Sequence, residues 1–285
     1  MKKVFKWIGI TLSTLIVLII LVGICLYLDA AARLNKNYNI STEAVSIPNT
    51  PVAIERGKHW VSILCTGCHG ENLAGGVVFE NPALGQIDAS NLTPGKGGVG
   101  QEYTDADWVR AIRHGVGPDG KPLVVMPSAD FYNLNDQNLE NIIAALKSLP
   151  PVNNEIPDPK FTPLGQVLMA ARAFGNVRDA EKIDHNGPRP IPVAPAVNTA
   201  YGEYLTRIIG CKTCHGTNFT GGKDPNPNAP PVPNITQSGE IKAWSEADFI
   251  TAARTRKSEF MPWEDLSRMT DDELKALWLF LKTLK

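Results

Sequence analysis

The chain has 285 residues, with 28 basic and 29 acidic side chains, a net charge of −1 at pH 7 and 43% apolar residues. This near-neutral balance argues against a nucleic-acid binder, which is usually basic, and the apolar content argues against wholesale disorder. Five cysteines, an odd number, also argue against a simple disulfide framework.

An uncharged, almost entirely apolar run covers residues 7–28. As a helix it would be about 33 Å long, enough to cross a bilayer. Lys2, Lys3 and Lys6 precede it, and because positive flanks stay in the cytoplasm, the rest of the chain is expected to be exported. The alternative is a signal peptide cleaved near residues 30–32, but the apolar region of such peptides is usually shorter. We expect a cytoplasmic tip and transmembrane anchor in residues 1–33, with Cys25 inside the span.

The other four cysteines lie in two C-x-x-C-H strings, at residues 65–69 and 211–215. Two thiols at this spacing can form thioethers with the vinyl groups of one haem, and the adjacent histidine can bind its iron. The alternatives for one C-x-x-C, a thioredoxin-like redox pair or half a zinc site, explain neither the histidine nor the repetition. The strings predict two covalently attached haem c groups, with thioethers at Cys65, Cys68, Cys211 and Cys214 and iron ligands at His69 and His215.

The strings open an internal repeat. Residues 70–76 (G-E-N-L-A-G-G) match 216–222 (G-T-N-F-T-G-G), and N-L-T at 91–93 matches N-I-T at 234–236. Thr104 and Ser245 then have the form of helix N-caps followed by acidic first turns. Residues 135–139 and 270–274 each open a closing helix with apolar residues at helical spacing. The repeat predicts two domains, at residues 52–150 and 196–285.

Met126 and Met261 occupy equivalent positions in the repeat, and a proline follows each. Proline favours an extended conformation in the residue before it, which suits a loop that presents a thioether to a haem face. Core packing is the common role of methionine, but the shared position favours iron ligation. We predict Met126 and Met261 as the second axial ligands, a pairing that raises the reduction potential above that of a bis-histidine haem.

The remaining charged and imidazole side chains are assigned as follows. His59 and His114 have no counterpart in the repeat and are expected at the surface or an edge, while His185 is expected to have a structural role between the domains. Arg113 and Arg254 correspond across the repeat. Either they offset the charge of haem propionates, or they lie on a solvated helix face.

Residues 151–195 form a proline-rich connector, which is expected to be stiff, with one short helix from Leu164 to Val177 that packs on a domain. The flanking domains differ in charge: residues 52–150 contain 7 basic and 11 acidic residues, whereas residues 196–285 contain 11 of each. We hypothesise that the two domains dock different partners, the acidic one facing a basic surface.

On these motifs, each copy resembles a class I cytochrome c domain. The pair resembles the membrane-anchored dihaem cytochromes c and is similar to the cytochrome c subunits of membrane-bound dehydrogenases. The resemblance implies an all-α fold, with an N-terminal transmembrane helix followed by two tandem cytochrome c domains. It also implies electron transfer as the activity.

We therefore expect a single-pass cell-membrane protein whose haem domains are periplasmic. It would pass electrons between redox protein partners, a dehydrogenase, oxidase or reductase of a respiratory chain, without catalytic residues of its own. The alternative is a dihaem enzyme, such as a peroxidase or a thiosulfate dehydrogenase. Peroxide chemistry needs an open sixth site, whereas both copies supply a methionine.

Overall fold

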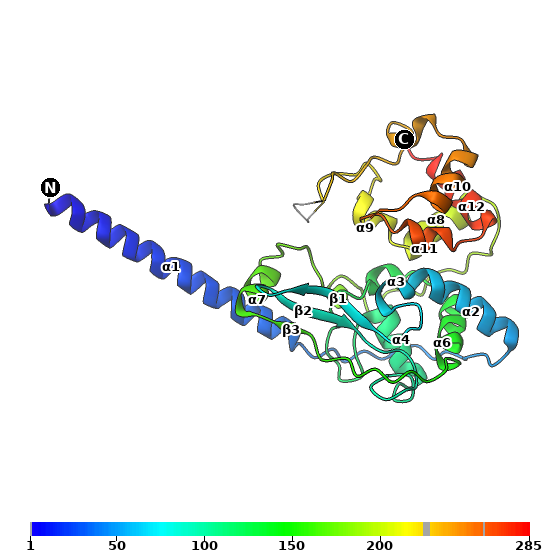
Figure 1. The fold of residues 1–285 in the computed structure, drawn as a ribbon, viewed down its shortest axis with the longest axis horizontal. Coiled ribbons are helices and arrows are strands. Elements are labelled where there is room, and N and C mark those ends of the chain that lie inside the picture. The colour runs from blue at the N-terminus through cyan, green and yellow to red at the C-terminus, as the bar shows by residue number, and fades with distance from the viewer. Residues whose placement is uncertain (1, 225–228, 259) are drawn as a thin grey trace.

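The computed structural model describes residues 2–224, 229–258 and 260–285, and this part of the chain is mainly helical. A long helix, α1 (Lys2–Leu34), projects away from two packed groups of helices (Figure 1). It is the one described helix that is long and apolar enough to cross a membrane. The expected helical fold with an N-terminal apolar helix is confirmed.

The two groups of helices follow the internal repeat. In the first copy, α2 packs against α6, and in the second α8 packs against α12. Short helices between them carry the repeated motifs. The first copy contains α2 (Pro51–Leu64), α3 (Thr66–His69), α4 (Asp105–His114), α5 (Ser128–Phe131) and α6 (Asp136–Lys147). The second contains α8 (Thr199–Ile208), α9 (Cys211–His215), η2 (Glu240–Ala243), α10 (Glu246–Thr255), α11 (Trp263–Ser267) and α12 (Asp271–Leu281).

The predicted helix starts are confirmed. The hydroxyls of Thr104 and Ser245 each accept a hydrogen bond from the backbone N–H three residues later, at 3.2 Å. The aspartates at those positions bond back to the cap N–H groups, so both helices begin with a complete capping box. Asn135 and Thr270 cap α6 and α12 in the same way with their side chains.

In each copy, one glycine sets how closely the first and last helices approach. A Cβ on Gly57 of α2 would lie 1.9 Å from the carbonyl oxygen of Asn141 in α6. A Cβ on Gly202 of α8 would lie 2.0 Å from the carbonyl oxygen of Ala276 in α12. No side chain fits at either crossing, so the backbones of the two helices are in direct contact.

A small antiparallel sheet, which the sequence analysis did not predict, is inserted in the first copy. Its strands, in the order β1-β2-β3, are β1 (Gly76–Asn81), β2 (Gly85–Ala89) and β3 (Lys160–Phe161). The run Val77–Val78–Phe79 favours a strand, and residues 82–84 form the turn of the hairpin. The corresponding stretch of the second copy, residues 222–233, has a different, proline-rich sequence, so the repeat gave no sequence signal for the sheet. Among its described residues, Gly222 and Val232 form a single antiparallel bridge.

The connector helix is shorter than predicted. α7 covers Pro163–Ala170, and the chain reverses after it through Arg172 (φ 55°) and Gly175 (φ 74°) rather than continuing to Val177. α7 packs on α1, and a Cβ on Gly165 would lie 2.0 Å from the carbonyl oxygen of Leu84 in the hairpin turn. The 3₁₀ turn η1 (Asp179–Glu181) follows.

We predict that Gly57→Ala destabilises the protein by about 1–3 kcal/mol, because the methyl group forces α2 and α6 apart. Gly76→Ala is the matched control, since its Cβ would meet nothing within 4 Å. The free energy of unfolding from urea titration is the measurement. Equal stability of the two variants would contradict the close crossing.

Candidate functional site

The histidines of the two C-x-x-C-H strings are held in the same way. His69 Nδ1 lies 2.8 Å from the carbonyl oxygen of Ser90, and His215 Nδ1 lies 2.9 Å from the carbonyl oxygen of Pro233. When Nδ1 donates to a carbonyl, Nε2 carries the free lone pair, the arrangement that a metal-binding imidazole needs. Both histidines are buried, and burial lowers the pKa of His69, which favours its neutral form.

The loop after each string folds back in the same way in both copies. The backbone N–H of Gly75 donates to the carbonyl of His69, and the N–H of Gly221 donates to that of His215, both at 2.9 Å. Leu73 and Phe219 take left-handed conformations at equivalent positions, with φ of 57° and 60°. The matching G-x-N-x-x-G-G segments therefore build the same turn behind each histidine.

Each string borders its own cavity, and the predicted methionine lines that cavity too. The first cavity, of about 450 Å³, is lined by Cys65, Cys68, His69 and Met126, with largely apolar walls. The second, of about 240 Å³, is lined by Cys211, Cys214, His215 and Met261. The structure thus brings all eight predicted site residues into two groups of four, one per copy.

These cavities suit a flat apolar macrocycle with acidic edges. In the first, the buried Nε1–H of Trp108 has no hydrogen-bond partner among the described residues, so it is free to donate to a ligand carboxylate. In the second, the guanidinium of Arg256 lines the wall, lies 4.6 Å from the ring centre of Trp244 and donates to Glu240 at 3.2 Å. The residues present fit haem, with two thiols, a histidine and a methionine in each cavity and a donor without a partner in the first.

The zinc and redox-thiol alternatives fit less well. No disulfide joins any of the five cysteines, and the described residues contain no group of three or more histidine, cysteine or acidic side chains placed to hold a metal. Burial raises the pKa of Cys65 and of Cys211 to about 12. Zinc ligation and disulfide exchange both need thiolates, which these buried sites disfavour.

Each copy also places an aspartate against the other copy's string, a feature that the sequence analysis missed. In α5, Asp130 accepts a hydrogen bond from the hydroxyl of Thr213 at 3.0 Å. In α11, the carboxylate of Asp265 lies beside Gly67 of the first string. A Cβ on Gly67 would be 3.2 Å from Asp265 Oδ2. Burial raises the pKa of both aspartates, that of Asp130 to about 6. The sequence does contain one indication of this contact, because an aspartate stands four residues after the methionine in both copies.

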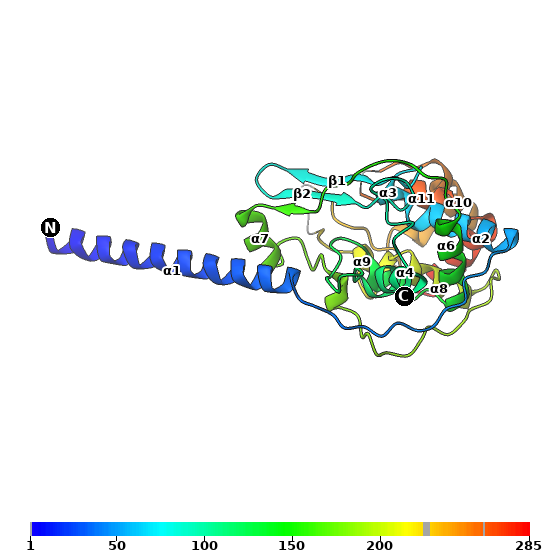
Figure 2. The ribbon, with the colours of Figure 1, turned by 90° about the horizontal axis from the view of Figure 1, so that it is seen from below.

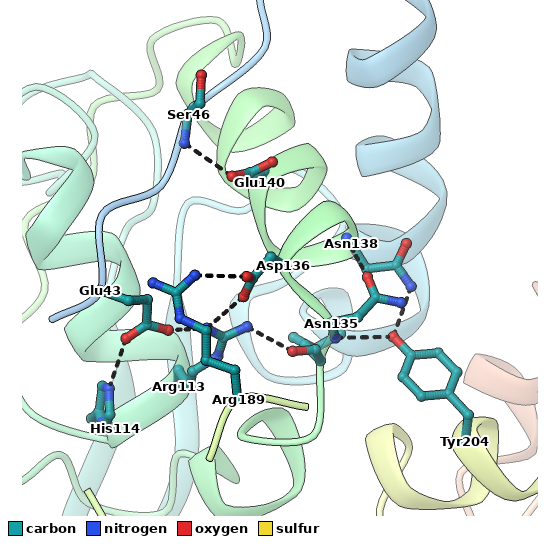
Figure 3. Close-up of polar contacts among 11 residues, drawn as sticks. Glu43, Ser46, Arg113, His114, Asn135, Asp136, Asn138, Glu140, Arg189 and Tyr204 are labelled. Atoms are coloured by element: carbon teal, nitrogen blue, oxygen red, sulfur yellow. Dashed lines mark hydrogen bonds and ion pairs between the residues drawn. The ribbon is translucent and has the colours of Figure 1, made fainter. Parts of the chain in front are cut away.

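Further polar contacts join the two copies around these aspartates. His59 Nε2 lies 2.9 Å from Glu273 Oε1, and Arg268 Nη1 donates to Glu71 Oε2 at 3.1 Å. The Nδ2 of Asn138 donates to the hydroxyl oxygen of Tyr204 at 2.8 Å, as Figure 3 shows. Both haem strings therefore face the contact between the copies, and His59 lies at its edge.

The expectation for His114 is wrong, because it is buried, with only 3% of its surface exposed. Its Nδ1 lies 3.1 Å from Nδ1 of His185, whose Nε2 bonds to the Ala180 carbonyl at 3.0 Å, in keeping with a structural role for His185. Burial, followed by the charges of Arg113 and Arg110, lowers the pKa of His114 to about 4, so it is neutral at pH 7.

Of the two alternatives for Arg113, the solvated helix face is wrong. Arg113 is buried and bonds to Glu43, to the carbonyl oxygen of Leu134 and, at 3.0 Å, to Asp136 (Figure 3), so its charge is already offset. Its counterpart Arg254 bonds to Asp271 at 2.7 Å but remains partly exposed. Both arginines tie the middle helix of a copy to the start of its closing helix.

The sequence matches the family model described as cytochrome C oxidase, cbb3-type, subunit III, over residues 52–144 and 198–281. The chain belongs to this cytochrome c family. Membership implies covalently bound haem c, in agreement with the cavities. The two matched segments fall on the two copies of the repeat.

Curated relatives of this cytochrome c chain are subunits of larger enzymes. The fructose dehydrogenase cytochrome subunit of Gluconobacter japonicus is 30% identical over 72% of this chain and 45% of the relative. The cytochrome c subunit of the quinone alcohol dehydrogenase of Gluconacetobacter polyoxogenes is 26% identical, over 85% of this chain and 58% of its own. The gluconate 2-dehydrogenase cytochrome c subunit of Pantoea cypripedii is 25% identical, over 77% and 56%. The chain spans about half the length of these relatives.

We predict that Asp130→Asn removes a pH dependence of stability. The pKa of Asp130 is about 6 in the folded protein, above the ordinary value of 3.8. The stability this group adds is therefore complete below pH 3.8 and is lost as the pH rises through 6, with a slope of at most about 1.4 kcal/mol per pH unit. Denaturation between pH 4 and 7 measures it. Asp272→Asn, at a carboxylate 77% exposed, is the control, and unchanged pH dependence in Asp130→Asn would contradict the assignment.

Arg113→Met should cost about 3–5 kcal/mol of unfolding free energy, because it leaves the carboxylate of Glu43 without this buried partner. The equivalent change Arg254→Met, at a side chain 32% exposed, should cost about 1 kcal/mol or less. Chemical denaturation of the pair measures the difference. Similar losses in both variants would show that the burial of Arg113 has no energetic consequence.

Proposed function

We propose that the protein is a membrane-anchored dihaem cytochrome c that transfers electrons between redox protein partners, as the electron-transfer subunit of an oxidoreductase complex. One observation carries the proposal: each of two cavities combines two thiols, a histidine with Nδ1 held by a carbonyl, and a methionine. In this proposal each copy of the repeat is one haem domain, bounded by residues 52–150 and 196–285.

The roles of the residues follow from their chemistry. Cys65 and Cys68 attach the first haem, as Cys211 and Cys214 attach the second. His69 with Met126, and His215 with Met261, would be the protein ligands of the two irons. When bound, each haem supplies a one-electron iron couple. The carbonyls of Ser90 and Pro233 fix the tautomer and orientation of the histidines, and the apolar walls exclude water from the iron.

The contact between the copies supports electron transfer from one domain to the other. Each haem string faces the opposite copy, through Asp130 on Thr213 and Asp265 beside Gly67. The Arg268–Glu71 ion pair and the hydrogen bond between His59 and Glu273 join the domains in this arrangement. In this arrangement the two strings that would carry the haems both lie at the contact between the copies.

Partners and location extend the same proposal. The named relatives are cytochrome subunits of fructose, alcohol and gluconate dehydrogenases, so we propose a membrane-bound dehydrogenase as the electron donor. The apolar run of α1 is proposed to span the cell membrane. Lys2, Lys3 and Lys6 before it favour a cytoplasmic N-terminus and haem domains on the extracytoplasmic side.

The proposal is tested by spectroscopy of the haem-loaded protein. Low-spin, six-coordinate spectra in both oxidation states, without peroxide or thiosulfate turnover, are expected of a carrier with methionine at both sixth positions. A high-spin haem together with turnover of either compound by the protein alone would instead support a dihaem enzyme.

Met126→Ala and Met261→Ala should each lower the midpoint potential of a single haem, by on the order of 100 mV, and open its iron to small ligands. Met269→Leu is the matched control, because Met269 is a core residue with 1% of its surface exposed and should leave both potentials in place. Potentiometric titration measures the shift. An unchanged titration of either alanine variant would refute ligation by that methionine.

A further inference from the structure

The connector helix α7 is composed like a membrane-surface helix. From Phe161 to Ala171 the chain carries no charge, and Gln166 is the single polar side chain within α7. Lys160 and Arg172 flank this stretch on either side. Leu and Phe side chains close to Lys and Arg are the residue types that protein segments at the headgroup region of a bilayer combine.

The fold places α7 directly beside the proposed membrane span. α7 packs against α1, where Ala30 is completely buried. Figures 1 and 2 show α7 beside the C-terminal part of α1, and Figure 2 shows the turn between β1 and β2 beyond α7, on the side away from α1. Both α7 and the turn lie at the end of the globular part from which α1 projects. Thr162 fixes this arrangement, because its N–H donates to the carbonyl of Leu84 at 3.1 Å and its hydroxyl to that of Ala83 at 2.6 Å.

Large apolar side chains remain uncovered on these elements. Leu164 of α7 is 51% exposed, Phe174 after it is 44% exposed, and Phe79 of β1 is 40% exposed. The turn of the hairpin, residues 81–85, is uncharged, although the exposed Glu80 precedes it. Exposed apolar groups on neighbouring elements mark an interaction surface, and α7, which carries Leu164, packs against the apolar helix α1.

We propose that α7 and the β1–β2 turn insert into the interfacial region of the bilayer that α1 spans, as a second membrane contact. The occupant of this surface is lipid, and the inference rests on the proposed anchoring by α1. A single spanning helix leaves the haem domains free to rotate and tilt. A second contact through α7, clamped to the sheet of the first copy, fixes the orientation of that copy over the membrane.

Photo-crosslinking of the full haem-loaded chain tests the contact. The protein is reconstituted into phosphatidylcholine–phosphatidylglycerol vesicles that contain a lipid with a diazirine on its acyl chain, and adducts are mapped by mass spectrometry. We expect adducts on α1, on residues 161–174 and on residues 79–85, and none on α2, which lies at the opposite end of the molecule (Figure 1). Leu164→Glu with Phe174→Glu should remove most adducts from residues 161–174, whereas Val52→Glu, at a position 63% exposed in α2, should not.

The outcomes separate this inference from the anchoring on which it rests. Adducts on α1 alone, with none on residues 161–174, would overturn the second contact and leave the anchor in place. If α1 itself carried no adducts, the proposed anchoring would fail. Adducts on residues 161–174 that persist at full level in the Leu164→Glu, Phe174→Glu variant would also contradict the assignment to these side chains.

Discussion

The hydrogen bond from each histidine Nδ1 to a backbone carbonyl is the constraint on which the rest of the site depends. It joins the C-x-x-C-H string to the loop that follows, through Ser90 in one copy and Pro233 in the other. The fixed ring leaves Nε2 as the free lone pair at the cavity. The rest of each cavity is built around this histidine. Its walls come from the glycine-rich turn behind the string, the methionine loop, and the first and last helices where they cross.

The second organising feature is the reciprocity of the contact between the copies. Asp130 and Asp265 stand at the same place in their own copies, and each approaches the string of the other. When the pH is above its pKa, each of these half-buried carboxylates places a negative charge beside the string of the other copy. In the proposed dihaem protein, such a charge would stabilise the oxidised iron of the neighbouring domain. One copy of the repeat on its own would supply the residues proposed to bind a haem, but it would lack the aspartate that the other copy contributes.

Much of this arrangement could be predicted from local patterns that repeat. The helix caps at Thr104 and Ser245 depend on side chains within four residues of one another, and the structure has them as expected. Features that depend on contacts between distant segments of the chain could not be predicted from local patterns. Arg113 is buried because Glu43 and Asp136 meet it from other parts of the chain, and His114 is buried by the connector. The β1–β2 hairpin lies where the two copies differ in sequence, and β3 and the early end of α7 lie in the connector, so the repeat gave no pattern from which to predict them.

The central claim is that each copy of the repeat holds one haem through its own pair of thiols. Intact-mass measurement of the purified chain, with haem absorption in pyridine, tests this most directly when the double variant Cys211→Ala, Cys214→Ala is measured beside the parent. The account predicts two haems per chain in the parent and one in the variant, attached within residues 65–69. A single haem in the parent, or two in the variant, would contradict it.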